Sequence, residues 1–524
     1  MKSVIIGTRG SQLALWQANY TKDILEQHGY QVELNIISTK GDRTQEWNLS
    51  FDKIEGKGFF TKEIEEALLR HEADLAVHSC KDMPTENAEG LAIKAYSYRA
   101  DPSDVLLIRK EATDYTQYIP LRKGAVTGTS SARRKAQILS HRMDLEVQDL
   151  RGNVPTRIEK LRSGQYDAII LAAAGIERLN IPVDDLIVYP LAPSLFIPAP
   201  AQGVLAYQVR ENDEEMADVC RILHDAAAYQ AVQLERDILH AFHGGCQVPL
   251  GVYARCEGDV THLWISKAVS WDAPLFRSYR SFKGNLPSPE TITQQFNEIS
   301  PAKVFISRDL SAEDYFPDFL KKAGFTVEGR SLVTIEPLAF KTDGQADWLF
   351  FTSKNGVKHY FNKVSYQEGR VPKIGVLNAG TAQAVRASGY EVSFEGRSSC
   401  TATTAKEFAA IATGRVILPQ ANNPRGVMEK ELTHCEVISL PVYENAVAAP
   451  VDKTDAAILV FTSPMNAGAY LDKYSPEPGQ QLIAIGYSTE ARIKEAGYDC
   501  HLSYGPMPWD LADVVMTVSA KEYR

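Results

Sequence analysis

The stretch Val4-Ile5-Ile6-Gly7-Thr8-Arg9-Gly10-Ser11 indicates the fold of the first part of the chain, because a short β-rich run is followed there by a polar turn. Apolar residues then recur at helical spacing until Gly29 ends the run: Leu13, Trp16, Tyr20 and Ile24. The pattern predicts a strand, a turn with a capping hydroxyl group, and a helix.

The same order returns further along the chain. Val126-Thr127-Gly128-Thr129-Ser130 precedes a run with helical spacing at residues 132–139. Further strand-like runs lie at residues 74–77 and 168–171. Alternating strands and helices of this kind are typical of parallel α/β sheets.

Composition narrows the class of protein. At 524 residues the chain is too long for one core, so roughly three to five domains are expected. The net charge of -10 argues against a general nucleic-acid binder, which needs a positive field. The seven cysteines form no CxxC pair, so neither a disulfide framework nor a metal site is expected. No signal peptide or membrane span is recognisable, and we expect a cytoplasmic, soluble monomer.

Proline-containing connections near residues 100–102 and 189–201 divide the first half. They bracket a middle segment, so we expect a first domain that the chain leaves and later re-enters. The expected boundaries are residues 1–99 with 196–215 for the first domain, 100–195 for the second and 216–284 for the third. Residues 285–301, which contain Pro287, Pro289 and Pro301, are interpreted as a linker.

The second half contains an internal duplication. Residues 348–353 read Trp-Leu-Phe-Phe-Thr-Ser, residues 458–463 read Ile-Leu-Val-Phe-Thr-Ser, and each run is followed at similar spacing by Ile-Gly. A repeat of this kind predicts two similar α/β lobes, of residues 302–336 with 442–524 and of residues 337–441. The fold class predicted for the whole chain is α/β, with two lobes and a small α+β domain before these.

Arg133 and Arg134 stand in the first turn of a predicted helix, where cations oppose the helix dipole. Two guanidinium groups beside free backbone N–H groups concentrate positive potential, which binds carboxylate or phosphate. A solvated helix start with incidental charge is the alternative. No GxxxxGK[ST] motif is present, and several separate arginines fit a ligand with many carboxylates better than one phosphate.

Cys246 lies in His243-Gly244-Gly245-Cys246-Gln247-Val248-Pro249-Leu250-Gly251, where two glycines let the backbone approach a bulky adduct. The alternative is that Cys246 is an inert residue that only packs in the core. Cys80 is a rival thiol, because Lys81 beside it favours the thiolate.

Together with Val77-His78-Ser79-Cys80-Lys81-Asp82-Met83-Pro84 and the segment at residues 127–135, this motif resembles hydroxymethylbilane synthase, also called porphobilinogen deaminase. The resemblance covers roughly the first 290 residues. It implies binding-protein-like lobes, and a dipyrromethane cofactor carried by Cys246 through a thioether. It also implies condensation of four porphobilinogen molecules into hydroxymethylbilane with release of ammonia.

The resemblance also implies roles for individual residues. Asp82 would accept hydrogen bonds from pyrrole N–H groups and stabilise the cation formed as ammonia leaves, although an ordinary surface pair with Lys81 is the alternative. Residues 54–60 resemble the family's loop over the cleft. Cofactor contacts are expected from Ser79, Lys81, Asp82, Thr129, Ser130, Arg133, Arg134, Arg151 and Gly152, and substrate contacts from Arg9, Ser11, Arg151, Arg157, Arg178 and Gln202.

From about residue 301 the chain resembles uroporphyrinogen-III synthase, on the repeated Phe-Thr-Ser runs, Ile485-Gly486 and Pro441-Val442-Tyr443. Hydroxyl-bearing turns after strands offer donors to propionates, whereas a helix cap is the alternative for each. The resemblance implies that Tyr443 assists loss of hydroxide, with a core or hinge tyrosine as the alternative. The expected substrate contacts are Thr352, Ser353, Ser463 and Thr489.

The interpretation is a bifunctional enzyme of porphyrin and haem biosynthesis, a transferase fused to a lyase. It would make hydroxymethylbilane and cyclise it to uroporphyrinogen III, without nucleic acid or membrane as partner. Two alternatives stay open: a deaminase with a non-catalytic C-terminal binding module, and a carboxylate solute-binding protein. The Gly-Gly-Cys motif and the missing signal peptide speak against the second.

Overall fold

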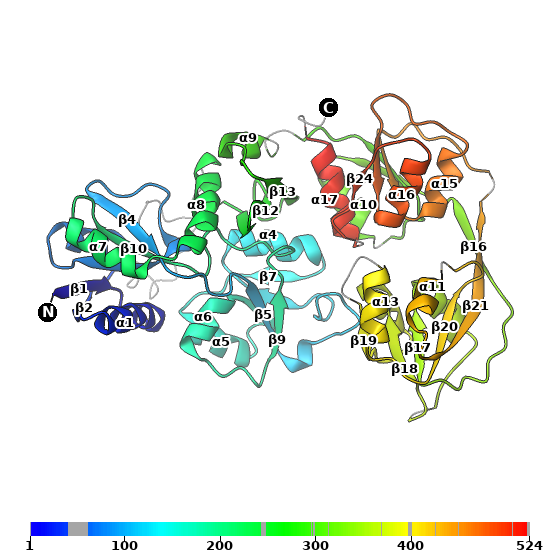
Figure 1. Ribbon diagram of the computed structural model, residues 1–524, viewed down its shortest axis with the longest axis horizontal. Helices are drawn as coiled ribbons and strands as arrows, with labels where there is room; N and C mark the ends of the chain where they lie inside the picture. Colours follow the sequence, from blue (N-terminus) through cyan, green and yellow to red (C-terminus); the bar gives the residue numbers. More distant parts are fainter. Residues whose placement is uncertain are drawn as a thin grey trace. The chain divides into compact units, whose positions relative to one another are not determined.

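The computed structural model describes residues 2–39, 61–242, 248–294, 296, 299–312, 314–367, 369–396, 401–424, 426–448, 450–505 and 507–520. The chain divides into two compact units, one mainly of residues 1–113 and 123–299 and one mainly of residues 114–122 and 300–519 (Figure 1).

The first unit begins with a sheet of five strands: β1 (Ser3–Thr8), β2 (Gln31–Ile36), β3 (Leu75–Ser79), β4 (Leu91–Tyr96) and β10 (Leu205–Arg210). Their order is β2-β1-β3-β10-β4, and β10 runs antiparallel to both neighbours. The helices are α1 (Gln12–Gln27), α3 (Lys62–Leu69) and α7 (Glu214–Leu223). Apolar residues of α1 and α7 are buried in one cluster with β1, as Leu25, Val219 and Val4 show, and the predicted strand, turn and helix at the N-terminus are confirmed.

A second sheet holds β5 (Asp104–Ile108), β6 (Val126–Gly128), β7 (Glu146–Gln148), β8 (Ala168–Ala172) and β9 (Ile187–Leu191) in the order β7-β6-β8-β5-β9. Its helices are α4 (Ala132–His141), α5 (Val154–Arg162), α6 (Ala173–Leu179) and the short turn η4 (Lys110–Ala112). β5 runs antiparallel to β8 and β9. The expected parallel α/β sheets therefore each contain one antiparallel strand, β10 in the first and β5 in the second, and each of these strands enters its sheet directly after the chain has crossed from the other one.

A third part of the first unit contains α8 (Ala226–Ala241), the antiparallel sheet β11 (Leu250–Glu257), β12 (Val260–Lys267) and β13 (Phe276–Lys283), and α9 (Pro289–Gln294). Two expected boundaries need correction. Helix α7 packs in the core of the first sheet through Met216 and Val219, so it does not begin the third domain. The segment interpreted as a linker contains α9, whose Ile292 is fully buried.

The second unit contains a parallel sheet in the order β15-β14-β22-β23-β24. Its strands are β14 (Lys303–Ile306), β15 (Thr326–Gly329), β22 (Ile458–Phe461), β23 (Gln481–Ala484) and β24 (His501–Leu502), and its helices are α10 (Tyr315–Lys322), α15 (Pro464–Leu471), α16 (Tyr487–Glu495) and α17 (Pro508–Val518).

Its other sheet follows the order β16-β21-β20-β17-β18-β19. The strands are β16 (Val333–Pro337), β17 (Trp348–Phe351), β18 (Lys373–Val376), β19 (Phe394–Glu395), β20 (Arg415–Ala421) and β21 (Glu436–Val447), and the helices are α11 (Lys354–Phe361), α12 (Ala379–Ala387), α13 (Thr401–Ala409) and α14 (Val427–Glu431). The expected lobe boundary at residue 336 cuts through β16. That strand belongs to this sheet, because it pairs antiparallel with β21 along its whole length.

The predicted duplication is confirmed at the level of secondary structure. One copy forms β17, α11, β18 and α12, and the other forms β22, α15, β23 and α16 in the same order. Ser353 and Ser463 cap the first helix of each copy, and Tyr360 and Tyr470 are fully buried at matching positions.

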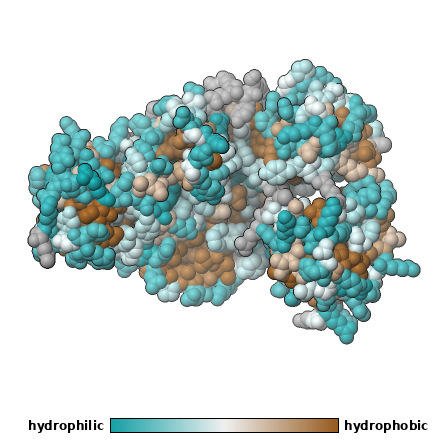
Figure 2. All heavy atoms as spheres, viewed as in Figure 1, coloured by the Kyte–Doolittle hydropathy of each residue, from teal (hydrophilic) through white to brown (hydrophobic). Residues whose placement is uncertain are grey.

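No helix in the described part of the chain is long and apolar enough to cross a membrane. The face seen in Figure 2 is mostly hydrophilic, and its apolar patches are separated by polar side chains.

Candidate functional site

Three hollows of the first unit lie next to one another and share lining residues. Their empty volumes are about 500, 900 and 560 Å³, and Ser79, Lys81, Asp82, Arg134 and Gln202 each line two of them. The walls come from the end of β3 on one side and from the first turns of α4, α5 and α6 on the other. We call these hollows together the cleft. The predicted site residues that line it are Arg9, Ser11, Ser79, Lys81, Asp82, Arg133, Arg134, Arg157, Arg178 and Gln202.

Lys81 and Asp82 stand on the 3-10 turn η3 (Cys80–Asp82), directly after β3. Asp82 is exposed, lines two of the hollows, and its carboxylate has no hydrogen-bond partner among the described residues. Lys81 Nζ donates to Gln202 Oε1 at 3.3 Å, and burial lowers the pKa of Lys81 to about 8. The alternative of a surface ion pair between Lys81 and Asp82 is thus not observed, and both side chains line the cleft.

Arg133 and Arg134 are not solvated helix-start charges, because both side chains are buried. Arg133 Nη1 donates to Asp104 Oδ2 at 2.8 Å, and Arg134 Nη2 donates to Asp104 Oδ1 at 2.7 Å. Burial by itself would raise the pKa of the Asp104 carboxyl, but the two guanidinium groups hold it well below its usual range. Both arginines therefore already have an anionic partner inside the protein.

Asp104 is a buried charged residue beside the cleft that sequence reasoning missed. It opens the apolar run of β5, directly after the proline-containing crossing between the two sheets. The signal that could have revealed Asp104 is an acidic residue at the start of an otherwise apolar strand, since a buried carboxylate needs charged or hydrogen-bonding partners.

Arg157 and Arg178 are two guanidinium groups of the cleft that pair with no carboxylate among the described residues. Arg157 Nε donates to the Gly152 carbonyl oxygen at 2.7 Å, and burial together with the Arg134 charge lowers the pKa of Arg157 to about 10. Arg178 Nη2 donates to the Gly203 carbonyl oxygen at 2.8 Å, while its Nε is buried and donates to no atom of the described residues. Both side chains therefore suit the carboxylates of a ligand.

Four predicted cofactor contacts do not line the cleft: Thr129, Ser130, Arg151 and Gly152. Thr129 Oγ1 accepts from the Ser131 backbone N–H at 3.3 Å, and Ser130 Oγ donates to the Leu150 carbonyl oxygen at 2.9 Å. Gly152 has a φ of 115°, and a Cβ there would lie 2.8 Å from Thr156 Cγ2. Their observed contacts shape the turns that carry Arg133 and Arg157.

Cys246 and the loop at residues 54–60 lie outside the described residues. On either side of the cysteine in the sequence, Leu239 and Val248 line the largest hollow. The rival thiol, Cys80, is fully buried, and burial raises its pKa to about 12. A thiol in that state is a poor nucleophile at neutral pH.

In the second unit, the predicted serines act as helix caps. Ser353 Oγ accepts from the Gly356 N–H at 3.1 Å, and Ser463 Oγ accepts from the Asn466 N–H at 3.1 Å. Thr489 is fully buried, and its hydroxyl has no hydrogen-bond partner within the part of the chain that the structure describes. Thr352 directly follows β17 and is partly exposed.

Tyr443 lies on β21 and is largely buried in the core of the six-stranded sheet. Its hydroxyl group is 3.0 Å from Ser353 Oγ, and its ring stacks on His359 with centroids 5.7 Å apart. The structure thus joins two of the predicted residues, one from β21 and one from the turn after β17.

Two α/β lobes with a cation-lined cleft between them define a class of proteins that hold an anionic ligand between lobes. The match to known families is specific. Residues 4–218 match the model of the porphobilinogen deaminase dipyrromethane cofactor binding domain, residues 229–272 match the porphobilinogen deaminase C-terminal domain, and residues 315–503 match uroporphyrinogen-III synthase HemD. The chain belongs to the porphobilinogen deaminase family and carries a uroporphyrinogen-III synthase domain in its second half.

Curated relatives cover the first half of the chain. The porphobilinogen deaminase of Sulfurimonas denitrificans is 48% identical over 263 residues, which is 50% of this chain and 82% of the relative. The porphobilinogen deaminase of Campylobacter jejuni is 45% identical over 257 residues, 49% of this chain and 81% of the relative. The chain thus combines hydroxymethylbilane formation on a dipyrromethane cofactor with cyclisation, two steps of tetrapyrrole biosynthesis.

Solved structures match each half at low sequence identity. Uroporphyrinogen-III synthetase from Helicobacter pylori is 17% identical with a TM-score of 0.32, over 42% of this chain and 100% of that protein. An arginine-specific periplasmic binding protein of Salmonella typhimurium is 11% identical with a TM-score of 0.28, over 43% of this chain and 92% of that protein.

Proposed function

We propose that Asp82 is the catalytic carboxylate of hydroxymethylbilane formation. The observation that carries this is its exposed carboxylate, which faces the cleft without a partner among the described residues. A preorganised, unneutralised carboxylate stabilises the positive charge that develops as ammonia leaves porphobilinogen, and it accepts the hydrogen bond of a pyrrole N–H. Lys81 beside it binds an acetate or propionate of the same ring.

The dipyrromethane is held by a thioether to Cys246 in this proposal. The cleft suits the carboxylates of cofactor and substrate together, because Arg157 and Arg178 have no anionic partner in the described structure and Arg178 Nε is a buried, unused donor. When bound, the dipyrromethane supplies the pyrrole carbon to which the first substrate unit is joined. Ser79 would hold cofactor side chains, and Arg9, Ser11, Arg157 and Arg178 would hold those of incoming substrate.

For the remaining family positions the proposal is narrower. Arg133 and Arg134 are already paired with Asp104, so they would bind the cofactor through N–H groups that do not donate to Asp104. Thr129, Ser130, Arg151 and Gly152 support the turns around those arginines, as their contacts suggest.

The test of the first activity is the intact mass of the full chain under denaturing conditions, for the wild type and for Cys246→Ser. A covalent excess of two pyrrole units that is lost in the variant supports the attachment. An active wild type with the bare polypeptide mass would refute it.

For the second activity we propose that Tyr443 and Ser353 act as a hydroxyl pair that assists loss of hydroxide from hydroxymethylbilane. Their contact of 3.0 Å supports this, because a phenol polarised by a neighbouring hydroxyl group is a better proton donor. We further propose a cytoplasmic monomer in which fusion raises the local concentration of the labile intermediate. Light scattering of the full chain, which measures its molar mass in solution, tests whether the protein is a monomer.

A further inference from the structure

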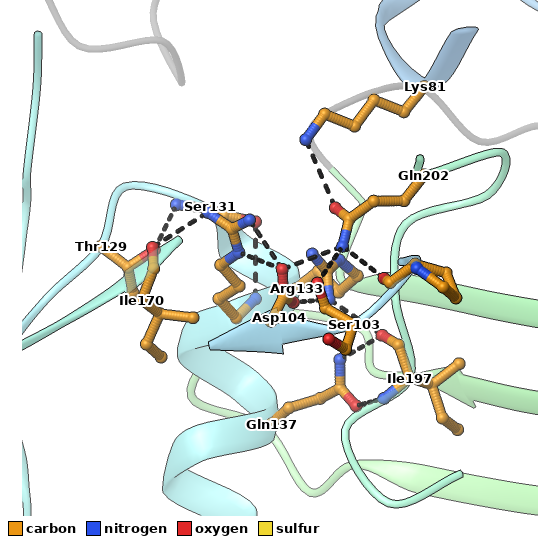
Figure 3. A network of polar contacts seen from close by, with 12 residues as sticks. Lys81, Ser103, Asp104, Thr129, Ser131, Arg133, Gln137, Ile170, Ile197 and Gln202 are labelled. Carbon is orange, nitrogen blue, oxygen red and sulfur yellow. Dashed lines mark hydrogen bonds and ion pairs between the residues drawn. The ribbon is translucent and has the colours of Figure 1, made fainter. Parts of the chain in front are cut away.

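Gln202 connects the two sides of the cleft (Figure 3). Lys81 stands on η3 beside the first sheet, whereas Asp104 begins β5 of the second. Gln202 Oε1 accepts from Lys81 Nζ at 3.3 Å, and Gln202 Nε2 donates to Asp104 Oδ1 at 3.0 Å. The three side chains form one continuous series of hydrogen bonds from the ammonium group to the buried carboxylate.

The partners of Gln202 allow its amide only one orientation. Nε2 also donates to the carbonyl oxygens of Pro102 at 2.8 Å and Ser103 at 3.3 Å. Carboxylate and carbonyl oxygens only accept, so all three require the NH2 end of the amide. Oε1 is left to face Lys81, whose ammonium group only donates.

Asp104 is itself held in place from several directions. It is fully buried, and it also accepts from Arg134 Nε at 3.2 Å in addition to the two ion pairs described above. Arg133 Nη1 donates further to the Ile197 carbonyl oxygen at 2.9 Å, and Arg134 Nη1 to that of Ile170 at 3.1 Å. Both guanidinium groups are anchored to the backbone, and they fix the carboxylate that orients Gln202.

We propose that Asp104 is a positioning residue for hydroxymethylbilane formation: by orienting Gln202 it gives the Lys81 ammonium group an acceptor, and so holds a charged lysine beside Asp82. The charged groups that act on Lys81 are Asp82 on its own turn, Asp104 on β5, and Arg133 and Arg134 on α4. Asp82 and Asp104 favour the ammonium form, while the two arginines and burial oppose it.

Asp104→Asn replaces the carboxylate that accepts from Gln202 Nε2 by a neutral amide, so that Gln202 is held chiefly by the carbonyl oxygens of Pro102 and Ser103. A less firmly held acceptor and the loss of the Asp104 negative charge both disfavour the charged form of Lys81. The lost hydrogen bond to a charged group corresponds to a downward shift of about one pH unit in the titration of Lys81.

The experiment measures acylation of Lys81 by acetic anhydride as a function of pH, on the full chain as purified, with peptide mass spectrometry. We expect half-maximal reactivity near pH 8 in the wild type and about one pH unit lower in Asp104→Asn. The alkaline limb of the deaminase pH profile should move in the same direction. A merely structural role would lower activity without moving either midpoint.

Two further variants keep the proposal falsifiable. Gln202→Met preserves the Asp104 ion pairs but removes the acceptor, so it should shift the Lys81 midpoint in the same direction even where Asp104→Asn does not fold. Asp144→Asn is the matched control, because Asp144 is held by Arg142 Nε at 2.7 Å in the same domain without contact to Gln202 or Lys81. An unchanged midpoint in folded Gln202→Met, or an equal shift in Asp144→Asn, would overturn the proposal.

Discussion

The fully buried Glu235 and the half-buried Arg99 form an ion pair that joins the three parts of the first unit. Arg99 Nη1 donates to Glu235 Oε1 at 2.7 Å, and Arg99 Nη2 donates to Oε2 at 3.2 Å. The same carboxylate accepts from the backbone N–H groups of Ala201 at 2.7 Å and Ala254 at 2.8 Å. Arg99 lies on the outgoing crossing between the sheets, Ala201 on the returning one, and Ala254 on β11, so one carboxylate ties all three together.

Glu235→Ala should destabilise the first unit strongly, because it leaves a half-buried arginine and two backbone donors without their acceptor. We expect a loss of about 3–5 kcal/mol in the free energy of unfolding, measured by urea denaturation. Glu257→Ala is the control, since Glu257 pairs with Arg255 at an exposed site and should change stability by less than about 1 kcal/mol. Equal effects of the two substitutions would contradict the assigned role.

Gly203→Ala should also be poorly tolerated. Gly203 has a φ of 90°, and a Cβ there would lie 2.6 Å from the Ala100 carbonyl oxygen, a backbone atom of the other crossing. Gly258→Ala provides the comparison, because its φ of 62° carries similar strain but nothing lies within 4 Å. We expect thermal unfolding of the Gly203 variant at a clearly lower temperature than that of the Gly258 variant, which should lose only about 1 kcal/mol.

Asp82→Asn should stall chain growth and leave the fold intact. The carboxylate is exposed and makes no hydrogen bond to a described residue, so its loss costs little stability. Loss of its charge from the cleft should lower kcat by about 100- to 1000-fold. Single-turnover kinetics and thermal unfolding of the same preparation test both parts, and unchanged turnover would remove Asp82 from its catalytic role.

His78 should make the first unit sensitive to acid. Burial lowers the pKa of His78 to about 4, and Arg9 adds to this while the hydrogen bond from His78 Nε2 to Gln208 Oε1 opposes it. The unfolded state, with a pKa near 6.5, therefore binds more protons between pH 6.5 and 4, and stability falls as the pH falls through that range. At pH 5 the loss should be about 2 kcal/mol relative to pH 7.

The check is urea unfolding of the wild type and of His78→Gln at both pH values. The variant lacks the titrating group, so its loss between pH 7 and pH 5 should be smaller by that amount. The same loss in both proteins would assign the acid sensitivity to other groups.

Tyr443→Phe should impair cyclisation while keeping the ring in the core. Without the hydroxyl group that contacts Ser353, we expect cyclisation of hydroxymethylbilane to slow by about 100-fold, so that uroporphyrinogen I forms at the expense of isomer III. Tyr474→Phe is matched, because its hydroxyl donates only to the Val451 carbonyl oxygen. The measurement is chromatography of the uroporphyrinogen isomers that the full chain makes from porphobilinogen. An unchanged isomer ratio would leave Tyr443 with a structural role.

Much of the fold was predictable from short-range patterns. The apolar spacing after Arg9 predicted α1, and the repeated Phe-Thr-Ser runs predicted two copies of the same β-α-β-α segment. These features depend on the 3.6-residue and two-residue periods of neighbouring side chains, which are visible in the sequence itself. The direction of β5 and β10 could not be predicted in this way, because it depends on where the chain crosses between the sheets.

By itself, the sequence determined the α/β class and the duplication, and it pointed to many of the polar residues that line the cleft. Only the tertiary structure decided which charges meet. Arg133 and Asp104 are 29 residues apart, and Arg99 and Glu235 are 136 apart, and nothing in their local sequence selects these partners. A buried charge is stable only where a distant segment supplies its counter-charge, so the pairing depends on how the two crossings bring separate domains together.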